Sequence, residues 1–538
     1  MARKINYDNW SKEELIKELR RIKETKYGLV WHRDLPEEKI DVLINPDART
    51  PSEMFPNEMA GKPFPILKEI KGKEINGDKG KPVNLLIEGD NYHSLAVLNF
   101  THQEAIDLIY IDPPYNTGSQ DFIYNDKFVD IEDPFKHSKW LAFMEKRLKL
   151  ARNLLKPEGL IFISIDDNEI AQLKLLCDEI FEESSFRNSL IVSRVKKNIQ
   201  EREFAKTINV GHGFVLFYAK PAAVIVIPTR YQEKKERWHA FDAPGLRQTM
   251  EYDLFGHKPP TGRHWMFEER KAKELIEKGL LRPNPKTGKP QYKLEASDTT
   301  KLDTDWTDLQ EGSSEWKFLN GEKNIELIKR IIGMYPSKDA IVLDFMAGSG
   351  TTGHAVLEAN KEDGGNRQFI LCTNNEDIDN KGNAIKHKIC SDICYPRLKK
   401  VIKGYLNTRS KKVVGLGGNL KYYTCDFVEA EPTDKNKRKL VSESTEMLCI
   451  RENAFELVQD EGDFKIFKNS DKYLGIVFYE EAINDFKKAI RKIKGHFNTY
   501  VFSVSDDPHE KQFADVKSKV TLCAIPEVIL KVYREIFR

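Results

Sequence analysis

Residues 341–353 read IVLDFMAGSGTTG, and this stretch decides the fold. Residues 341–344 form an expected strand, three glycines follow at the spacing G-x-G-x-x-G, and a helix is expected from residue 352 onward. A strand that passes through a glycine turn into a helix is typical of open α/β sheets, which bind ligands at the carboxyl ends of their strands. The turn lacks the Gly-Lys-Ser/Thr ending of a phosphate-binding loop, whereas an NAD-binding turn also fits the glycine spacing.

Three acidic residues at expected strand ends are candidates for binding a cofactor. Asp344 stands at the tip of its strand, close to the glycine loop, where a carboxylate would attract the ammonium of a cationic cofactor and would lie poorly beside a pyrophosphate. Glu376 follows the next expected strand, near the place where an acid can bind ribose hydroxyls. Asp90 ends another strand and either accepts a hydrogen bond from an adenine amine or caps the helix at 92–100, and the two roles are compatible.

Short apolar runs with helices between them extend this unit in both directions. Strands are expected at 83–87, 107–111, 160–165, 189–193, 213–218, 340–344 and 367–371, and helices at 140–155, 168–181, 324–334 and 352–360. Runs of this length that alternate with helices predict an α/β fold with a mainly parallel sheet of about seven strands, covered on both faces. Residues 219–315 are polar and rich in Pro and Gly, so a large insertion splits the sheet in two.

The two ends of the chain look separate from this sheet. Residues 1–82 comprise a charged helix at 11–26, with Ser11 as its N-cap, and an arm rich in Pro, Gly and Lys. Residues 410–538 alternate between strands and helices of their own: strands at 473–479 and 499–504, helices at 480–493 and 526–537. We therefore expect the main sheet to be complete by about residue 405 and a small C-terminal α/β domain to serve interactions.

Composition indicates a cytoplasmic protein. The 538 residues include 86 basic and 84 acidic side chains, a net charge of +2. No apolar run is long enough to span a bilayer, and the N-terminus lacks the apolar core of a signal peptide. Cys390 and Cys394 share one face of an expected helix, but no further ligands stand at a spacing typical of zinc. We expect reduced cysteines and no metal.

A second motif lies at residues 109–116, IYIDPPYN, where an apolar strand runs into two prolines. Because each proline fixes φ and lacks an N–H, the strand must end in a rigid loop. The loop presents the Asp112 carboxylate, carbonyls at Pro113 and Pro114, and the ring of Tyr115. Two acceptors can bind the N–H groups of an amine on a flat base, while Tyr115 stacks on that base at a gain of about 1–3 kcal/mol. The alternative is a merely rigid loop.

Together the two motifs resemble those of the β-class DNA amino-methyltransferases. Residues 112–118 (Asp-Pro-Pro-Tyr-Asn-Thr-Gly) and 344–354 (Asp-Phe-x-Ala-Gly-Ser-Gly-Thr-Thr-Gly-His) are similar to the methyltransferase (Mod) subunits of type III restriction-modification systems. One extra residue separates Phe345 from Gly348. The resemblance covers residues 83–405 and implies a Rossmann-like sheet of seven strands. It also implies S-adenosylmethionine as methyl donor and adenine N6 as acceptor, because Asp rather than Ser opens the first motif.

The resemblance also implies a set of site residues. The catalytic residues would be Asp112, Pro113, Pro114 and Tyr115. The cofactor would be held by Asp344, Phe345, Ala347, Gly348, Gly350 and Thr351, with Glu376, Asp90, Asn91, Phe318 and Asn320 in support. Phe318 and Asn320 stand where the family has a motif that helps to close the cofactor pocket. Its usual Pro-Lys-Pro is replaced here by residues 320–324, Asn-Gly-Glu-Lys-Asn.

The insertion is expected to read DNA sequence. Its basic residues are interleaved with aromatic ones, and the candidate DNA contacts are Arg194, Lys196, Lys197, Arg237 and Arg263. The expected domains are then residues 1–82, a catalytic domain at 83–185 and 316–405, the reader at 186–315, and the C-terminal domain at 410–538. Expected partners are double-stranded DNA, a second copy of the chain and a restriction (nuclease or translocase) subunit.

Three functions stay open at this point. The leading one is an adenine-N6 methyltransferase of a restriction or phage-defence system. The second is a stand-alone or cytosine-N4 DNA methyltransferase. The third is an NAD-binding enzyme, for which the motif at residues 112–115 would have no use.

Overall fold

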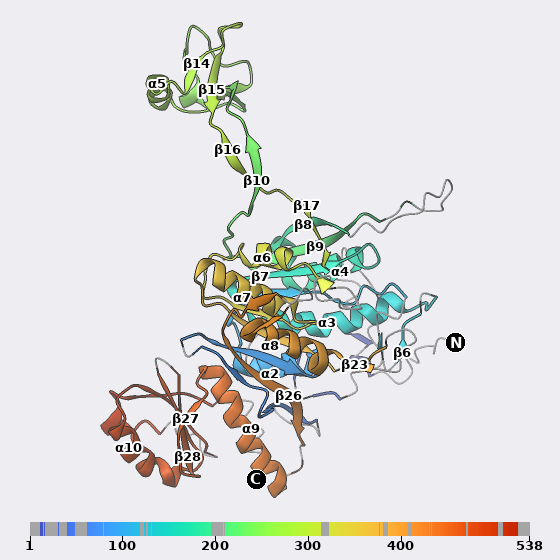
Figure 1. Ribbon diagram of the computed structural model, residues 1–538, viewed down its shortest axis with the longest axis vertical. Coiled ribbons are helices and arrows are strands. Elements are labelled where there is room, and N and C mark those ends of the chain that lie inside the picture. The colour runs from blue at the N-terminus through green and yellow to red at the C-terminus, as the bar shows by residue number, and fades with distance from the viewer. Residues whose placement is uncertain are drawn as a thin grey trace. The chain divides into compact units, whose positions relative to one another are not determined.

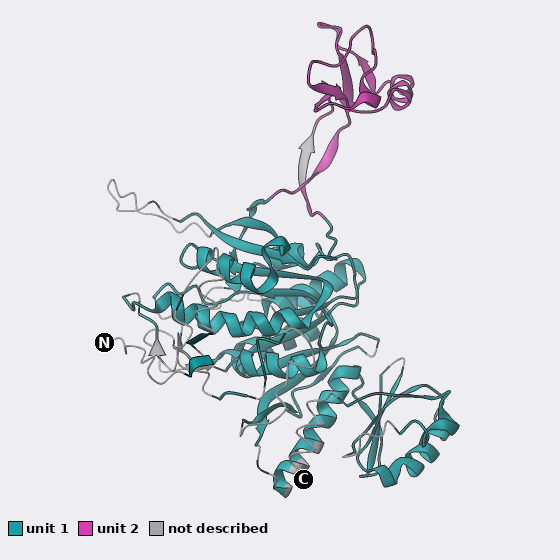
Figure 2. Cartoon of the chain, turned by 180° about the vertical axis from the view of Figure 1, so that it is seen from behind, with its two compact units in different colours: residues 1–226, 304–538 teal, residues 227–303 magenta. Residues whose placement is uncertain are grey.

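The computed structural model describes most of the chain, in two compact units. The described residues are 11–13, 15–16, 31, 40–42, 44–48, 62–78, 80–118, 123–124, 127–130, 132–194, 208, 210–313, 322–375, 377–379, 386–406, 411–429, 431, 433–469, 472–503 and 509–525. One unit comprises Met1–Val226 and Thr304–Arg538, and the other comprises Ile227–Asp303 (Figure 2). Most of the helix expected at 11–26, and all of the helix expected at 526–537, lie outside the described residues.

The first unit is built on a mixed sheet of eleven strands in the order β1-β26-β3-β21-β20-β4-β7-β9-β8-β17, with β2 paired to β26 (Figure 1). The bounds are β1 Phe64–Glu69, β2 Ile75–Asn76, β3 Val83–Glu88, β4 Ile106–Ile111, β7 Leu155–Ile165, β8 Phe186–Ser193, β9 His212–Ala219, β17 Asp305–Gln310, β20 Ile341–Asp344, β21 Gln368–Thr373 and β26 Asn419–Val428. All seven strands expected from the sequence lie in this sheet. The α/β prediction is confirmed, and the total of about seven strands is too low.

Two rows of helices cover the sheet. One row is α2 (Asn91–Thr101), α3 (Lys136–Leu154) and α4 (Ile170–Phe181); the other is α6 (Ile325–Ile332), α7 (Thr351–Asp363) and α8 (Tyr395–Lys403). Neighbours within each row pack together. The chain moves along the sheet in one direction through α2 and α3 and in the opposite direction through α7. Because β-α-β crossovers are right-handed, the two rows cover opposite faces.

The sheet extends beyond the limits expected from the sequence at both ends of the chain. β26 pairs in parallel with β3, and β1 pairs antiparallel with β26. The prediction that the sheet is complete by about residue 405 is therefore wrong, and the arm before residue 83 contributes two strands. The sequence of β26 lacks the pattern of a strand, because polar and apolar residues are mixed along it and its burial does not alternate.

The C-terminal part adds helix α9 (Asp434–Glu452) and a second sheet in the order β27-β28-β29-β30-β31. The strands are β27 Glu456–Asp460, β28 Phe464–Lys468, β29 Tyr473–Val477, β30 Phe497–Val501 and β31 Val520–Leu522, with α10 at Ile483–Lys492. β29, β30 and α10 stand where the sequence places strands and a helix. Helix α9 packs against β1 and α2 of the main sheet.

The second unit, Ile227–Asp303, is smaller than the insertion expected at 186–315. The difference arises because β8, β9 and β17 belong to the main sheet. The unit contains short strands and one helix: β10 Thr229–Lys234, β11 Arg237–Ala240, β12 Asp242–Pro244, β13 Arg263–Trp265, β14 Leu281–Pro283, β15 Pro290–Leu294, β16 Ser297–Lys301 and α5 Glu269–Glu277. Its own core is formed by Phe241, Leu254, Trp265, Ala272 and Leu281.

Short two-stranded pairs complete the described structure. They are β5 Ile123–Tyr124 with β6 Lys127–Phe128, β18 Gly312–Ser313 with β19 Glu322–Lys323, β22 Asp377–Asp379 with β23 Lys386–Lys388, and β24 Gly404–Leu406 with β25 Lys412–Val414. Among the described helices, none combines the length and the apolar character that crossing a bilayer requires.

Candidate active site

The two motifs meet at the carboxyl ends of neighbouring strands. β4 and β20 are parallel, with Leu108 opposite Val342. Asp112 follows β4 directly, and Asp344 is the last residue of β20. The strand order reverses direction between these two strands, because the chain leaves β4 toward β7 and leaves β20 toward β21. Such a switch point is where open α/β sheets form their ligand crevice.

Buried side chains from two helical segments fix the loop after β4. Nε1 of Trp140, in α3, donates to the carbonyl of Pro114 at 2.7 Å. Asn116 is buried with φ of 57°, a left-handed conformation that asparagine tolerates better than most residues. Its Nδ2 donates to Oε1 of the buried Glu169 at 2.5 Å. The loop carrying Asp112 and Tyr115 is therefore held by hydrogen bonds to α3 and to the residue that precedes α4.

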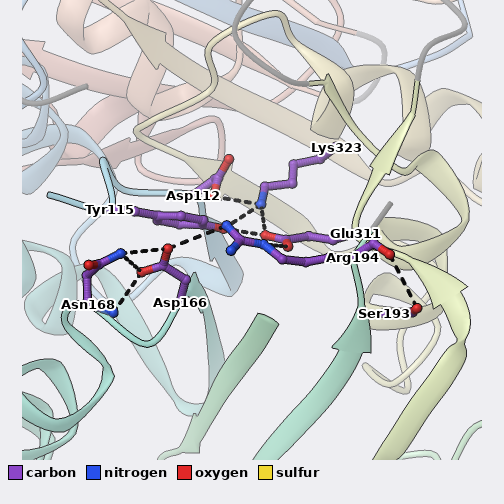
Figure 3. A network of polar contacts seen from close by, with 8 residues as sticks. All are labelled: Asp112, Tyr115, Asp166, Asn168, Ser193, Arg194, Glu311 and Lys323. Carbon is purple, nitrogen blue, oxygen red and sulfur yellow. Dashed lines mark hydrogen bonds and ion pairs between the residues drawn. The ribbon is translucent and has the colours of Figure 1, made fainter. Parts of the chain in front are cut away.

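Lys323, from β19, joins the functional groups of this loop (Figure 3). Its Nζ lies 3.1 Å from Oδ1 of Asp112 and 2.5 Å from Oε1 of Glu311. The same Nζ lies 2.5 Å from the hydroxyl of Tyr115. Tyr115 donates its hydroxyl proton to Oε1 of Glu311 at 2.5 Å. One ammonium thus sits among two carboxylates and a phenol.

The charges of this cluster follow from burial and from their neighbours. Burial raises the pKa of Asp112, and the Lys323 ammonium only partly opposes this rise. Burial also acts to raise the pKa of Glu311, but Lys323, Tyr115 and Arg194 outweigh it and hold that pKa below its usual value. Burial acts to lower the pKa of Lys323, yet the two carboxylates raise it overall. Lys323 and Glu311 are therefore charged, and Asp112 is a stronger base than an exposed aspartate.

The glycine turn follows β20 and begins α7. Gly348 and Gly350 have φ of 47° and 79°, conformations that glycine adopts without strain. A Cβ on Gly350 would lie 2.8 Å from Sγ of Cys394, so this turn also needs glycine for space. A Cβ on Gly348 would meet no atom within 4 Å, so the turn is open there.

Asp344 stabilises this turn from inside. Its Oδ1 accepts the backbone N–H of Met346 at 3.0 Å, and its Oδ2 accepts the hydroxyl of Thr352 at 2.5 Å. Burial raises the pKa of Asp344 to about 7. Phe345 is fully buried in the hydrophobic core, and Ala347 and Thr351 are also buried. Direct contact between these residues and a cofactor stays a prediction.

A buried arginine ties the glycine turn to the segment that carries Lys323. Arg397, from α8, forms an ion pair with Glu322 at 2.6 Å. It also donates to the hydroxyls of Ser349 and Thr351 at 3.0 and 2.9 Å. No sequence motif marks Arg397, because it lies outside both motifs in an ordinary amphipathic helix.

Asp90 has the capping role expected from the sequence. Its Oδ1 accepts the N–H of Tyr92 at 2.7 Å at the start of α2, and Arg147 pairs with it at 3.2 Å. Burial acts to raise the pKa of Asp90, but Arg147 and His93 lower it overall. Arg147 also donates to Oδ1 of Asn91. Binding of an adenine amine by Asp90 stays a prediction, and the cofactor candidates Glu376, Phe318 and Asn320 lie outside the described residues.

The candidate DNA contacts have different surroundings. Arg194 lies 3.4 Å from Oδ2 of Asp166 and 3.5 Å from Oε2 of Glu311, so it belongs to the polar cluster at the loop after β4. Arg237 is exposed on the second unit, and Arg263 pairs there with Asp242. Lys196 and Lys197 lie outside the described residues. Within the described part of the chain, no group of three or more His, Cys, Asp or Glu side chains could hold a metal ion.

Comparison with known proteins gives a family for this site. A family model described as DNA methylase matches residues 106–383, more than half of the chain. The chain is 35% identical over 349 residues to the type III restriction-modification enzyme StyLTI Mod subunit of Salmonella typhimurium, covering 55% of this chain and 53% of that protein. It is 29% identical over 463 residues to the EcoPI Mod subunit of Escherichia phage P1, covering 70% and 71%.

A third relative is the type II methyltransferase M.KpnI of Klebsiella pneumoniae. It is 30% identical over 377 residues, which cover 60% of this chain and 89% of that protein. The chain thus spans about half the length of the Salmonella relative and most of the Klebsiella one. The matched region contains β4, β20 and the loops that follow them. The chain belongs to the DNA methylase family.

Proposed function

We propose that this protein transfers a methyl group from S-adenosylmethionine to N6 of adenine in double-stranded DNA, as the Mod subunit of a type III restriction-modification system. One observation carries the proposal. The Asp-Pro-Pro-Tyr loop and the glycine turn follow neighbouring parallel strands at the point where the strand order reverses. A base held at the first loop would therefore lie close to a cofactor held at the second.

The residues present fit S-adenosylmethionine. The glycine turn is open at Gly348, and the carboxylate of Asp90 stands at the end of β3, two strands away from β20. Asp344 shapes the turn, and its carboxylate, when ionised, favours a cationic ligand over a pyrophosphate. When bound, S-adenosylmethionine supplies an electrophilic methyl group. The chain's own residues then have to hold the acceptor amine and take up its proton.

The loop after β4 suits that task. The lone pair of an exocyclic amine is delocalised into the ring of its base, so the amine is a weak nucleophile. The Asp112 carboxylate and the Pro113 carbonyl can accept its two N–H groups and favour a more tetrahedral nitrogen. Tyr115 supplies an aromatic face for a base that has left the duplex, which costs a few kcal/mol. The raised pKa of Asp112 suits it to accept the proton that the nitrogen loses.

Partners follow from the same proposal. Unit Ile227–Asp303 carries the exposed Arg237 and the half-buried Trp238, over whose ring Arg282 lies at 3.7 Å. We assign DNA reading to this unit. The second sheet offers Leu457 and Val458, exposed on its edge strand β27. We assign contacts with a second copy or a restriction subunit to this part of the chain.

The test is the chemical identity of the product. The purified protein is incubated with unmethylated double-stranded DNA and labelled S-adenosylmethionine, and the digested DNA is analysed by mass spectrometry. We expect N6-methyladenine. Detection of N4-methylcytosine would show that the target base is cytosine rather than adenine. NAD binding without methyl transfer would refute the proposal. Cleavage of unmethylated DNA after addition of a co-expressed nuclease subunit would separate a type III system from a stand-alone enzyme.

A further inference from the structure

Glu311 comes directly after β17, the strand by which the chain returns from the insertion to the main sheet. The chain leaves the main sheet after β9 and returns through β17, which pairs in parallel with β8. Glu311 follows β17, and its backbone N–H donates to the carbonyl of Ser193, the last residue of β8, at 2.7 Å. Its own carbonyl accepts the N–H of Asn324 at 2.9 Å. The backbone of Glu311 is thus fixed on one side to β8 and on the other to the residue after Lys323.

The side chain of Glu311 occupies a buried slot between its polar partners and β9. The carboxylate is buried, with Tyr115 and Lys323 on Oε1 and Arg194 on Oε2 (Figure 3). Gly213 of β9 forms one wall, because a Cβ there would lie 2.8 Å from Oε2. A glycine that leaves room for a buried carboxylate, and an arginine that neutralises it, together fix its position.

We propose that Glu311 is a positioning residue for methyl transfer: it orients the Tyr115 ring for the target base and holds Lys323 beside Asp112. This inference rests on the proposed function. A phenol held only by its own loop can swing about its side-chain bonds, whereas a hydroxyl bound to a fixed carboxylate cannot. Since Glu311 directly follows β17, a shift of β17 relative to β8 would move the contacts that Glu311 makes with Tyr115 and Lys323. The segment that follows β17 thereby sets the positions of Tyr115 and Lys323 in the active site.

The experiment compares variants of the full chain in DNA methylation. Glu311→Gln removes the charge and keeps the size, while Gly213→Ala keeps the carboxylate and pushes it from its slot. Asp308→Asn is the matched control, because Asp308 lies on β17 shortly before Glu311 but pairs with Arg330 at 2.7 Å. We expect kcat to fall about 10- to 100-fold in the first two variants, as for a displaced catalytic group, and the control to stay within about twofold.

Two further readouts separate positioning from a general loss of structure. The Kd for S-adenosylmethionine should change less than about twofold in all three variants, since none touches the glycine turn. The acid limb of the pH profile should move to lower pH in Glu311→Gln, because the Glu311 charge helps to raise the pKa of Asp112. Tyr115→Phe, which removes only the hydroxyl, should reduce the further effect of Glu311→Gln when the two are combined.

The outcomes test the positioning role of Glu311 separately from the proposed methyltransferase function. An active parent with Glu311→Gln and Gly213→Ala both as fast as Asp308→Asn would overturn the positioning role alone. An inactive parent chain would overturn the proposed function, and the inference with it. If Glu311→Gln does not fold, Gly213→Ala and Tyr115→Phe still decide: full activity in both would overturn the positioning role.

Discussion

Nζ of Lys323 lies 3.1 Å from Oδ1 of Asp112, although the whole insertion separates the two residues in sequence. The pair lies at the start of the loop that follows β4, where Asp112 would accept a hydrogen bond from the amine of a target base. Lys323 is the cation that most opposes the effect of burial on Asp112. The pair therefore sets the pH range in which the carboxylate is ionised.

We predict that Lys323→Met moves the acid limb of the methylation rate to higher pH. Loss of the ammonium leaves burial and the Glu311 charge to raise the pKa of Asp112 further, so a larger fraction of Asp112 is protonated at a given acidic pH. The measurement is kcat/KM against pH. Lys338→Met, at an exposed pair with Asp363, serves as control. An acid limb that stays in place or moves down would contradict the assigned electrostatics.

We predict that Asp112→Ala lowers methyl transfer by about 100-fold or more while cofactor binding persists. Asp112 belongs to the loop after β4, whereas the cofactor is assigned to the turn after β20. Transfer of labelled methyl groups and calorimetry with S-adenosylmethionine measure the two properties separately. A variant that keeps more than about a tenth of the parent rate would remove Asp112 from its catalytic role.

We predict that Asp344→Asn flattens the dependence of stability on pH. The pKa of Asp344 is about 7 in the folded chain against an ordinary 3.8. A carboxyl with a raised folded-state pKa contributes its stability fully below about pH 4 and loses it as pH rises through 7, a change of about 4 kcal/mol. The free energy of unfolding, measured with denaturant between pH 5 and pH 8, should therefore fall less in the variant. Parallel curves for variant and parent would show that Asp344 does not titrate in this range.

We predict that truncation after Lys411 destabilises the catalytic unit, whereas truncation after Asn453 leaves it folded. The shorter chain loses β26, which lies between β1 and β3, and exposes the edge of β3. The longer chain keeps β26 and α9, which ends at its cap Asn453. Thermal unfolding and cofactor binding distinguish the two. Cofactor binding by the chain that ends at Lys411 would show that β26 is dispensable.

Local sequence was enough to predict the central strands and both motifs, because apolar runs and glycine or proline turns act within a few residues. It did not predict the cluster around Tyr115. The Tyr115 hydroxyl meets Glu311 and Lys323 across 196 and 208 positions of sequence. These contacts exist only because the chain returns from the insertion through β17 at the edge of the main sheet, and no local sequence pattern predicts that pairing.

β10 and β16 have a consequence for how this protein can change over generations. The two strands pair antiparallel, with Thr229 opposite Lys301, and the N–H of Leu302 donates to the carbonyl of Pro228 at 2.8 Å. Both connections of unit Ile227–Asp303 thus run as one two-stranded stem. Replacing the unit therefore changes the chain at only two points, which lie next to each other in the stem. The unit can therefore be exchanged by recombination as a single cassette. If it reads DNA as proposed, a lineage would acquire a new sequence preference while its methylation chemistry is inherited unchanged.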